Sequence, residues 1–264
     1  MQIENPLPVP PAPPPSGNPS ASRKKWGALG TLGVLLFKFK GFVLLALTKG
    51  KLVLLGLTKL NTLLSMLASI GVYWLLYGWK FGLGFVLSIY VHEMGHVMAL
   101  ARYGIPASAP MFIPFFGAFI RLKAYPATAG EDARVGLAGP LWGLGAALAC
   151  MGIWQATGSG LFAALARVGA WINVFNLIPI WQLDGGRGFR ALTRHHRMLI
   201  AALSAVLWMW TSETMLIVVA IASVWRCFTK DTPGQPDDMV FYQFAGLLAA
   251  LAAVYAVTAG PAQF

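Results

Sequence analysis

The sequence predicts an all-α polytopic membrane protein with six or seven transmembrane helices. Of its 264 residues, 57% are hydrophobic and 11% are charged, whereas about 25% of the residues of a soluble globular domain are charged. Apolar runs recur from Thr62 to Gly260, and such runs are typical of helices that cross a bilayer. The composition therefore excludes an ordinary soluble enzyme and a disordered chain.

The first part of the chain is predicted to carry no chemistry of its own. Residues 1–25 form a disordered cytoplasmic tail, since residues 1–22 hold 8 of the 17 prolines and such stretches favour a solvated, polyproline-like backbone. Residues 26–61 form a lysine-bordered segment, in which residues 31–61 contain an approximate ten-residue repeat. Because lysine is costly at the bilayer centre, we expect amphipathic helices on the membrane surface here. A lysine-bordered span is the alternative.

The later apolar runs predict the transmembrane helices in order. They cover residues 62–79, 81–103, 133–156, 160–181, 196–211, 213–229 and 239–259. The fifth and sixth runs are short and nearly adjacent, so they predict either two spans or one bent helix. We expect residues 62–230 to form one transmembrane domain, and residues 231–264 to form a loop and a C-terminal transmembrane helix.

The positive charge of the chain predicts its orientation. The formal net charge is +11, but the lysines and arginines lie between apolar runs rather than along one soluble face, which disfavours a nucleic-acid partner. Placing the N-terminal tail in the cytoplasm puts nearly all basic loops there too, as the positive-inside rule requires. We therefore expect a multi-pass integral membrane protein whose N-terminus and active-site opening face the cytoplasm.

Two acidic residues, Glu93 and Asp184, lie within or at the end of apolar runs, where an ionisable group is a functional-site hypothesis. His92 and His96 are four residues apart, share one helix face, and can both bind one metal ion at ~2.0–2.1 Å. Glu93 can reach a metal-bound water as a general base, which is the logic of an HExxH motif. The alternative is two histidines that hydrogen-bond at a helix interface. Three polar groups within five residues at membrane depth favour a shared metal instead.

A catalytic zinc site has three protein ligands and an open position, so a third ligand is needed. His195 and His196 are possible, but they lie in the basic run Arg187–Arg197, which predicts a solvated cytoplasmic flank. Asp184 is better placed, because it follows the fourth predicted span on the same side of the membrane. The alternative for Asp184 is an N-cap of the following helix.

These residues resemble the site-2 protease family of intramembrane zinc metalloproteases. The family pattern is HExxH in one span and NxxPxxxLDG in a later one, and the chain matches both at His92–His96 and Asn176–Gly185. Two weaker features agree, namely Ala138-Gly139-Pro140 and a segment over Met111–Leu122 that is similar to the hairpin after the HExxH helix. The resemblance covers about residues 81–190 and implies a three-span metalloprotease core with a short membrane-associated hairpin.

The resemblance implies that His92, His96 and Asp184 bind Zn²⁺, that Glu93 is the catalytic base, and that Asn176 helps to hold an unwound substrate. It also implies an intramembrane zinc metalloendopeptidase that acts in regulated intramembrane proteolysis. The partners would be the lipid bilayer and a transmembrane client protein as substrate. Strand pairing with the hairpin around Gly117 would keep the substrate extended; the alternative for this segment is a connector loop that dips into the bilayer.

Three other functions could use some of the same residues, and each makes a different demand on the sequence. A metalloprotease of another class would take a later glutamate as third ligand, but the later ones are Glu131, predicted in a loop beside Asp132, and Glu213, predicted on the opposite side of the membrane. A non-proteolytic metal-binding membrane protein, such as a transporter, would show more polar residues along a path. An inactive relative would bind clients without cutting them, and the intact Glu93 disfavours it. The sequence leaves the client and the oligomeric state open.

Overall fold

The computed structural model describes residues 59–120, 124–233 and 235–258. The predicted tail over residues 1–25 and nearly all of the predicted amphipathic segment over residues 26–61 lie outside the described residues. The described part is mostly helical and lies within one unit that begins at Leu55.

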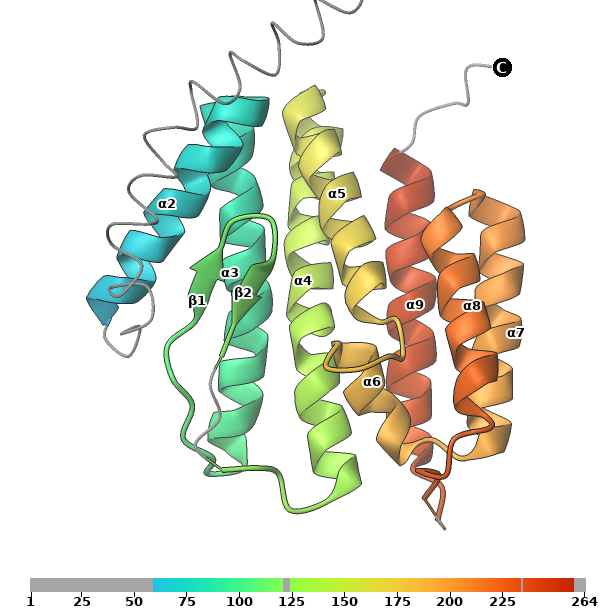
Figure 1. Ribbon diagram of the computed structural model, residues 1–264. Coiled ribbons are helices and arrows are strands. Elements are labelled where there is room, and N and C mark those ends of the chain that lie inside the picture. The colour runs from blue at the N-terminus through green and yellow to red at the C-terminus, as the bar shows by residue number, and fades with distance from the viewer. Residues whose placement is uncertain (1–58, 121–123, 234, 259–264) are drawn as a thin grey trace, which may run out of the picture. The chain divides into compact units, whose positions relative to one another are not determined.

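Eight α-helices, one 3-10 turn and one strand pair make up the described part of the chain (Figure 1). The elements are α2 (Lys59–Tyr77), α3 (Trp79–Arg102), β1 (Met111–Ile113), β2 (Gly117–Phe119), α4 (Ala129–Thr157), α5 (Gly160–Asn176), α6 (Asp184–Gly188), η1 (Phe189–Ala191), α7 (Arg194–Thr211), α8 (Thr214–Arg226) and α9 (Asp238–Thr258).

Every predicted span in the described residues coincides with a helix, but the ends differ where local chemistry decides them. The predicted fifth and sixth spans are two separate helices, α7 and α8, which pack against each other and are separated at Ser212. The interpretation as one bent helix is therefore wrong. Three helices, α3, α4 and α9, are long and apolar enough to cross a membrane, so the total of six or seven spans stays a prediction.

Two helix ends differ from the predicted ranges for identifiable reasons. α4 begins at Ala129 rather than near 133, because Thr128 accepts a hydrogen bond from the Glu131 N–H and Glu131 accepts one from the Ala127 N–H. This pair is similar to a capping box, except that Glu131 accepts from Ala127, the residue before the N-cap Thr128. Asp132 therefore lies in the first turn of the helix and not in a loop as predicted. α5 ends at Asn176 rather than at 181, because Pro179 has no N–H for a helical hydrogen bond.

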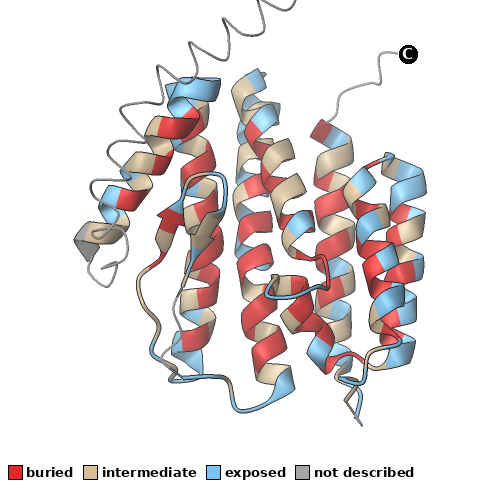
Figure 2. Cartoon of the chain, viewed as in Figure 1, coloured by how far each residue is buried: buried red, intermediate tan, exposed pale blue. Residues whose placement is uncertain are grey.

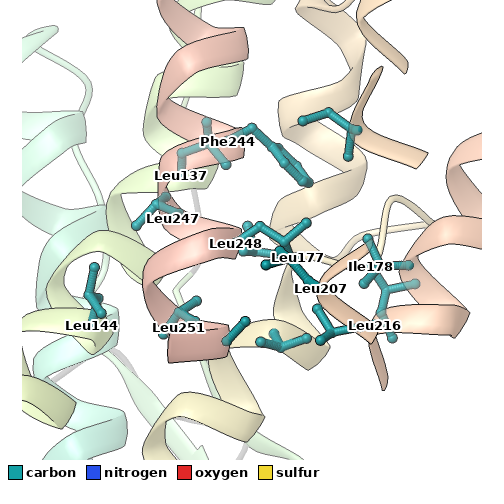
Figure 3. Close-up of a cluster of buried hydrophobic side chains, with 14 of the residues drawn as sticks. Leu137, Leu144, Leu177, Ile178, Leu207, Leu216, Phe244, Leu247, Leu248 and Leu251 are labelled. Atoms are coloured by element: carbon teal, nitrogen blue, oxygen red, sulfur yellow. The ribbon is translucent and has the colours of Figure 1, made fainter. Parts of the chain in front are cut away.

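The helix α4 occupies the middle of the bundle, where it contacts α3, α5, α6 and α9. The main apolar core fills the space between α4, α7, α8 and α9 (Figure 3). Its largest members include Leu137 of α4, Leu216 of α8 and Phe244, Leu248 and Leu251 of α9, each fully or almost fully buried. This packing holds the loop between α5 and α6 against the bundle through Leu177 and Ile178.

The outer faces of the bundle expose many large apolar side chains. Buried residues run along α3, α4 and α9, whereas exposed ones are frequent on α2, α7 and α8 (Figure 2). The exposed set includes Leu67, Trp74, Trp208, Ile221 and Trp225. Extended exposed apolar surface is rare on soluble monomers, so this surface favours a bilayer as the surrounding medium.

The strand pair after α3 is the predicted hairpin. β1 and β2 are antiparallel, with Phe112 opposite Ala118, and Leu122 of the predicted segment lies outside the described residues. The Phe112 N–H donates to Ser65 Oγ at 3.2 Å, and the Phe115 N–H donates to the Tyr73 hydroxyl at 3.1 Å. Both acceptors are on α2, so α2 holds β1 through Phe112 and the turn of the hairpin through Phe115. The position of the hairpin in the bilayer stays a prediction.

The basic run Arg187–Arg197 is only in part the solvated flank that was predicted, since Arg190 and Arg194 are exposed whereas Arg187 and Arg197 are not. The side chain of Arg197 is fully buried and donates to the carbonyl oxygens of Phe189 and Asp231 at 2.8 and 3.1 Å and to the Asp231 carboxylate at 3.2 Å. The Arg187 side chain, 15% exposed, bonds the buried Asp132. Acceptors that are distant in sequence draw these arginines inward, which charge patterning alone does not reveal.

Candidate metal centre

Side chains from α3 and α6 meet where α6 packs on α4, in the lower half of the bundle as drawn in Figure 1. His92 and His96 come from α3, and Asp184 is the first residue of α6. His92 Nε2 lies 3.1 Å from Asp184 Oδ2, His96 Nε2 lies 3.3 Å from Asp184 Oδ1, and the two Nε2 atoms are 3.2 Å apart. The structure thus brings together the three predicted metal ligands, although α3 and α6 are far apart in sequence.

The other ring nitrogen of each histidine has its own partner. His96 Nδ1 lies 2.8 Å from the Val135 carbonyl oxygen, and His92 Nδ1 lies 2.8 Å from Asn173 Oδ1. The Asn173 amide nitrogen donates to the Gly169 carbonyl at 2.7 Å, which fixes the orientation of this amide. Since both partners are acceptors, each Nδ1 carries the proton and donates, and the Nε2 atom of each neutral ring presents a lone pair to the centre.

The donor set fits a zinc ion. When both rings are neutral, two Nε2 lone pairs and a carboxylate converge, so the group offers only acceptors and would be completed by a cation. A tetrahedral zinc ion with ligand distances of about 2.0–2.1 Å separates neighbouring ligand atoms by about 3.3 Å, which agrees with the separations of 3.1–3.3 Å. Within residues 59–120, 124–233 and 235–258, this is the only group of three such side chains whose ligand atoms lie within 4.8 Å of one another.

Glu93 lies beside this group on α3. Its side chain is buried, at 7% exposure, and its charge interacts with His92 and Asp184. It is not a member of the converging ligand set. A buried carboxylate that neighbours a metal site without belonging to it is placed for proton transfer.

The helix α4 closes one side of the centre by presenting glycine there. A Cβ atom on Gly139 would collide with His96 Nε2 and would lie 2.6 Å from His92 Nε2. One turn further on, a Cβ atom on Gly143 would collide with the Asn173 amide. The backbone of α4 therefore passes directly against the imidazole rings, and only glycine leaves room for them and for the supporting amide.

Asp184 is held in place by the start of α6 and by an ion pair behind it. The N-cap of α6 is Leu183, and no side chain caps this helix, so the alternative of Asp184 as an N-cap is wrong. Arg187 of α6 donates to Asp132 Oδ1 through Nε at 2.9 Å and Nη2 at 2.7 Å, and Arg190 donates to Asp132 Oδ2 at 2.9 Å. These contacts tie α6 to the first turn of α4.

The other candidate ligands have different roles. His195 is exposed, and the buried His196 lies 3.3 Å from Asp238 and stacks on Phe241. Glu131 caps α4, and the Glu213 carboxylate accepts from the Met215 N–H at the start of α8. The structure thus leaves no second candidate for the third ligand among these residues.

The predicted substrate residues lie on the two segments beside the centre. Asn176 is the last residue of α5, directly before the loop that leads to Asp184. Gly117 begins β2 with a φ of 84°, a left-handed conformation that suits glycine. Their roles in substrate binding stay predictions.

Sequence reasoning missed Asn173, which orients His92. The available signal was an uncharged polar residue inside the apolar run of α5, three positions before Asn176. Ionisable residues alone do not reveal it, because the amide of Asn173 carries no charge.

Two comparisons with known proteins bear on this site. Residues 80–159 match the family model described as Peptidase family M50. The resemblance to the site-2 protease family is confirmed. A protein of Methanocaldococcus jannaschii named zinc metalloprotease MJ0392 is 28% identical over 111 residues, which are 40% of this chain and 32% of that protein. The chain thus spans about a third of the length of this relative.

The match to the M50 family covers α3 and α4 but ends before α6. It includes His92, Glu93, His96 and the glycines of α4, whereas Asp184 lies beyond it. The place of Asp184 beside the two histidines is therefore an independent observation from the structure.

Proposed function

We propose that this protein is a zinc metalloendopeptidase of the site-2 protease type, which hydrolyses peptide bonds within or near transmembrane segments of client membrane proteins. The observation that carries the proposal is the convergence of two Nε2 lone pairs and one carboxylate on a single point, with Glu93 beside them. The M50 match over residues 80–159 supports the same chemistry.

His92, His96 and Asp184 would hold the zinc ion, which when bound supplies Lewis acidity and increases the acidity of a coordinated water. Glu93 would accept a proton from the attacking water and pass it to the leaving amine. Asn173 and the Val135 carbonyl keep the two imidazoles in the tautomer that turns Nε2 to the centre. The two histidines are buried and the Asp184 side chain is only 13% exposed, which limits access of bulk water.

A peptide bond within a helix is shielded by its own hydrogen bonds, so the substrate must become extended before cleavage. The Phe112 N–H points to Ser65 on α2, hence away from β2. In an antiparallel pair, residues opposite each other turn their backbone groups the same way, either both inward or both outward. Ala118, opposite Phe112, therefore directs its backbone groups to the outer edge of β2, where a substrate strand would add.

Membrane clients are the substrate class that fits the surroundings of the site. The ligands come from α3, a candidate span, and the outer surface of the bundle is apolar. We infer a role in regulated intramembrane proteolysis, with the N-terminus and the opening of the site on the cytoplasmic side. This orientation is supported by the distribution of lysines and arginines, which are concentrated in alternate loops of the sequence.

The test uses the full chain in vesicles together with a synthetic single-span peptide labelled on both sides of the span. Wild type is expected to contain zinc and to cleave the peptide, and Glu93→Gln is expected to contain the same zinc and to lose cleavage. Glu131→Gln is the matched control, because glutamine also serves in a capping box. It should keep both properties.

Other outcomes point to the alternatives. Zinc without cleavage in wild type would indicate a non-proteolytic metal-binding membrane protein. Peptide binding with neither zinc nor cleavage would indicate an inactive relative. Equal cleavage by wild type and Glu93→Gln would contradict the assignment of Glu93 as catalytic base.

A further inference from the structure

An apolar groove lies at the turn between α2 and α3, apart from the candidate metal centre. It is lined by Ile70 and Trp74 of α2 and by Trp79 and Leu83 of α3, and it encloses about 250 Å³. This volume is below the range of about 300–1,000 Å³ that is typical of pockets for small molecules. The groove is shallow and largely open to its surroundings, and its walls are almost entirely apolar, so it fits a hydrocarbon chain lying along the surface rather than a compact polar ligand.

The two tryptophans of the groove are half exposed, at 56% for Trp74 and 53% for Trp79. They stand where α2 ends at Tyr77 and α3 begins at Trp79 (Figure 1). Tryptophan is enriched where the hydrocarbon of a bilayer meets its headgroups. The two tryptophans therefore indicate a position for the groove near the depth where an acyl chain joins a phospholipid headgroup.

One cation stands beside this groove. Lys80 Nζ lies 5.7 Å from the centre of the Trp79 ring. Its side chain is exposed, and it forms no ion pair within the described part of the chain. From residue 59 to residue 92 the sequence has no aspartate or glutamate. The charge of Lys80 is thus not neutralised by its neighbours on α2 and α3.

We propose that this groove binds an acyl chain of an anionic phospholipid whose phosphate group pairs with Lys80. The apolar walls match the hydrocarbon chain, the tryptophans match the region of the glycerol backbone, and the lysine matches the phosphate. A helix of a partner protein would cover a broad face rather than enter a groove of this size, and it would not require the cation.

The test reconstitutes the full chain in vesicles of phosphatidylcholine with a minor fraction of phosphatidylglycerol, extracts it in mild detergent, and measures retained phospholipid by native mass spectrometry. Wild type is expected to retain phosphatidylglycerol in preference to phosphatidylcholine. Lys80→Gln should reduce this preference about fivefold, the contribution of one lysine beside an anionic headgroup. Arg102→Gln, an exposed cation at the other end of α3, should leave it unchanged.

A second pair of variants tests the groove itself. Leu83→Trp fills the groove and should abolish retention of phospholipid. The control is Leu87→Trp, at a position one turn further along α3 that is 44% exposed. This variant should bind phospholipid as wild type does. Equal retention of the two lipids by wild type, or the same loss in each variant and its control, would overturn the proposal. These measurements do not depend on zinc or on cleavage, so they can fail while the proposed peptidase function stands.

Discussion

The molecule buries charged groups in two places, and the two differ in what their atoms offer one another. At the start of α7, the buried guanidinium of Arg197 meets carbonyl oxygens and the Asp231 carboxylate, so donors face acceptors. At the candidate metal centre, two Nε2 lone pairs and the Asp184 carboxylate face one another, so acceptors face acceptors. The charge of Arg197 is paired within the protein, although its Nε has no hydrogen-bond partner among the described residues, whereas the second cluster offers only acceptors and would be completed by a cation.

The largest expected effect comes from removing a ligand. Asp184→Ala leaves two histidine ligands, so the zinc affinity should fall by more than about 100-fold, the upper figure for loss of a partner that only supports a ligand. Cleavage should be lost as well. The measurement is zinc content per chain after dialysis against graded concentrations of a chelator.

Asp231→Ala is the matched control for this ligand experiment, because it removes a carboxylate from the cluster around Arg197. Its zinc content should equal that of wild type. If Asp184→Ala also retained the zinc of wild type, the three-ligand centre would be wrong.

The second prediction concerns Arg197, whose substitution should lower the free energy of unfolding and leave the zinc content unchanged. Arg197→Met removes the guanidinium and leaves the Phe189 and Asp231 carbonyls without their donor. The expected loss is about 3 kcal/mol, at the lower end of the range for breaking a buried ion pair, because the Asp231 side chain is 40% exposed. Unfolding by dodecyl sulfate in mixed micelles measures this loss.

Arg194→Met serves as control for Arg197→Met. The Arg194 side chain is exposed on the same turn of α7, so the change in stability should stay within about 0.5 kcal/mol. Equal destabilisation by both substitutions would show that burial of Arg197 has no special energetic role.

The third prediction separates support of a ligand from handling of the substrate. Asn173→Leu removes the acceptor for His92 Nδ1, so the zinc affinity should fall about 10–100-fold. Asn173→Asp restores an acceptor for the imidazole and should recover most of the affinity. Chelator competition measures both variants.

Asn176→Leu completes this third experiment. Asn176 belongs to the same helix but is not among the hydrogen-bond partners of the two histidines. Its zinc affinity should match wild type while cleavage of the peptide declines, as expected of a residue that holds the substrate. A loss of zinc affinity in Asn176→Leu comparable to that in Asn173→Leu would remove the distinction between the two asparagines.

Sequence reasoning was most successful where local pattern decides the structure. The apolar runs predicted each long helix of the described residues, because a bilayer imposes length and apolarity on its spans. The four-residue spacing of His92 and His96 is a property of the helix itself. Asp184 was reached only through a motif, since nothing local reveals that α6 folds back against α3.

The features that escaped prediction depend on contacts between distant segments. Arg197 was assigned to a solvated flank, but carbonyl groups from η1 and from the loop after α8 surround it. Asn173 draws its role from His92, 81 positions earlier. The position of Asp132 in the first turn of α4 depends on the cap formed by Thr128 and Glu131. In each case the decisive partner is a tertiary contact or a cap, which hydropathy does not encode.

The smallest expected effect is a pH dependence confined to the cluster around Arg197. Partial burial raises the pKa of Asp231, but a hydrogen bond from the Thr229 hydroxyl and the charges of Arg226 and Arg197 lower it further, so that it lies below its ordinary value. A carboxyl group with a depressed pKa stabilises the folded state above its unfolded pKa of about 3.9, and this contribution is lost as the pH falls through the folded value. Wild type should therefore be more stable than Asp231→Asn at pH 6, and the difference should shrink below about pH 4. Both proteins are measured after chelation of metal, so that loss of metal does not contribute to the measured difference. A stability difference that stays constant down to pH 2 would show that Asp231 acts through packing rather than through its charge.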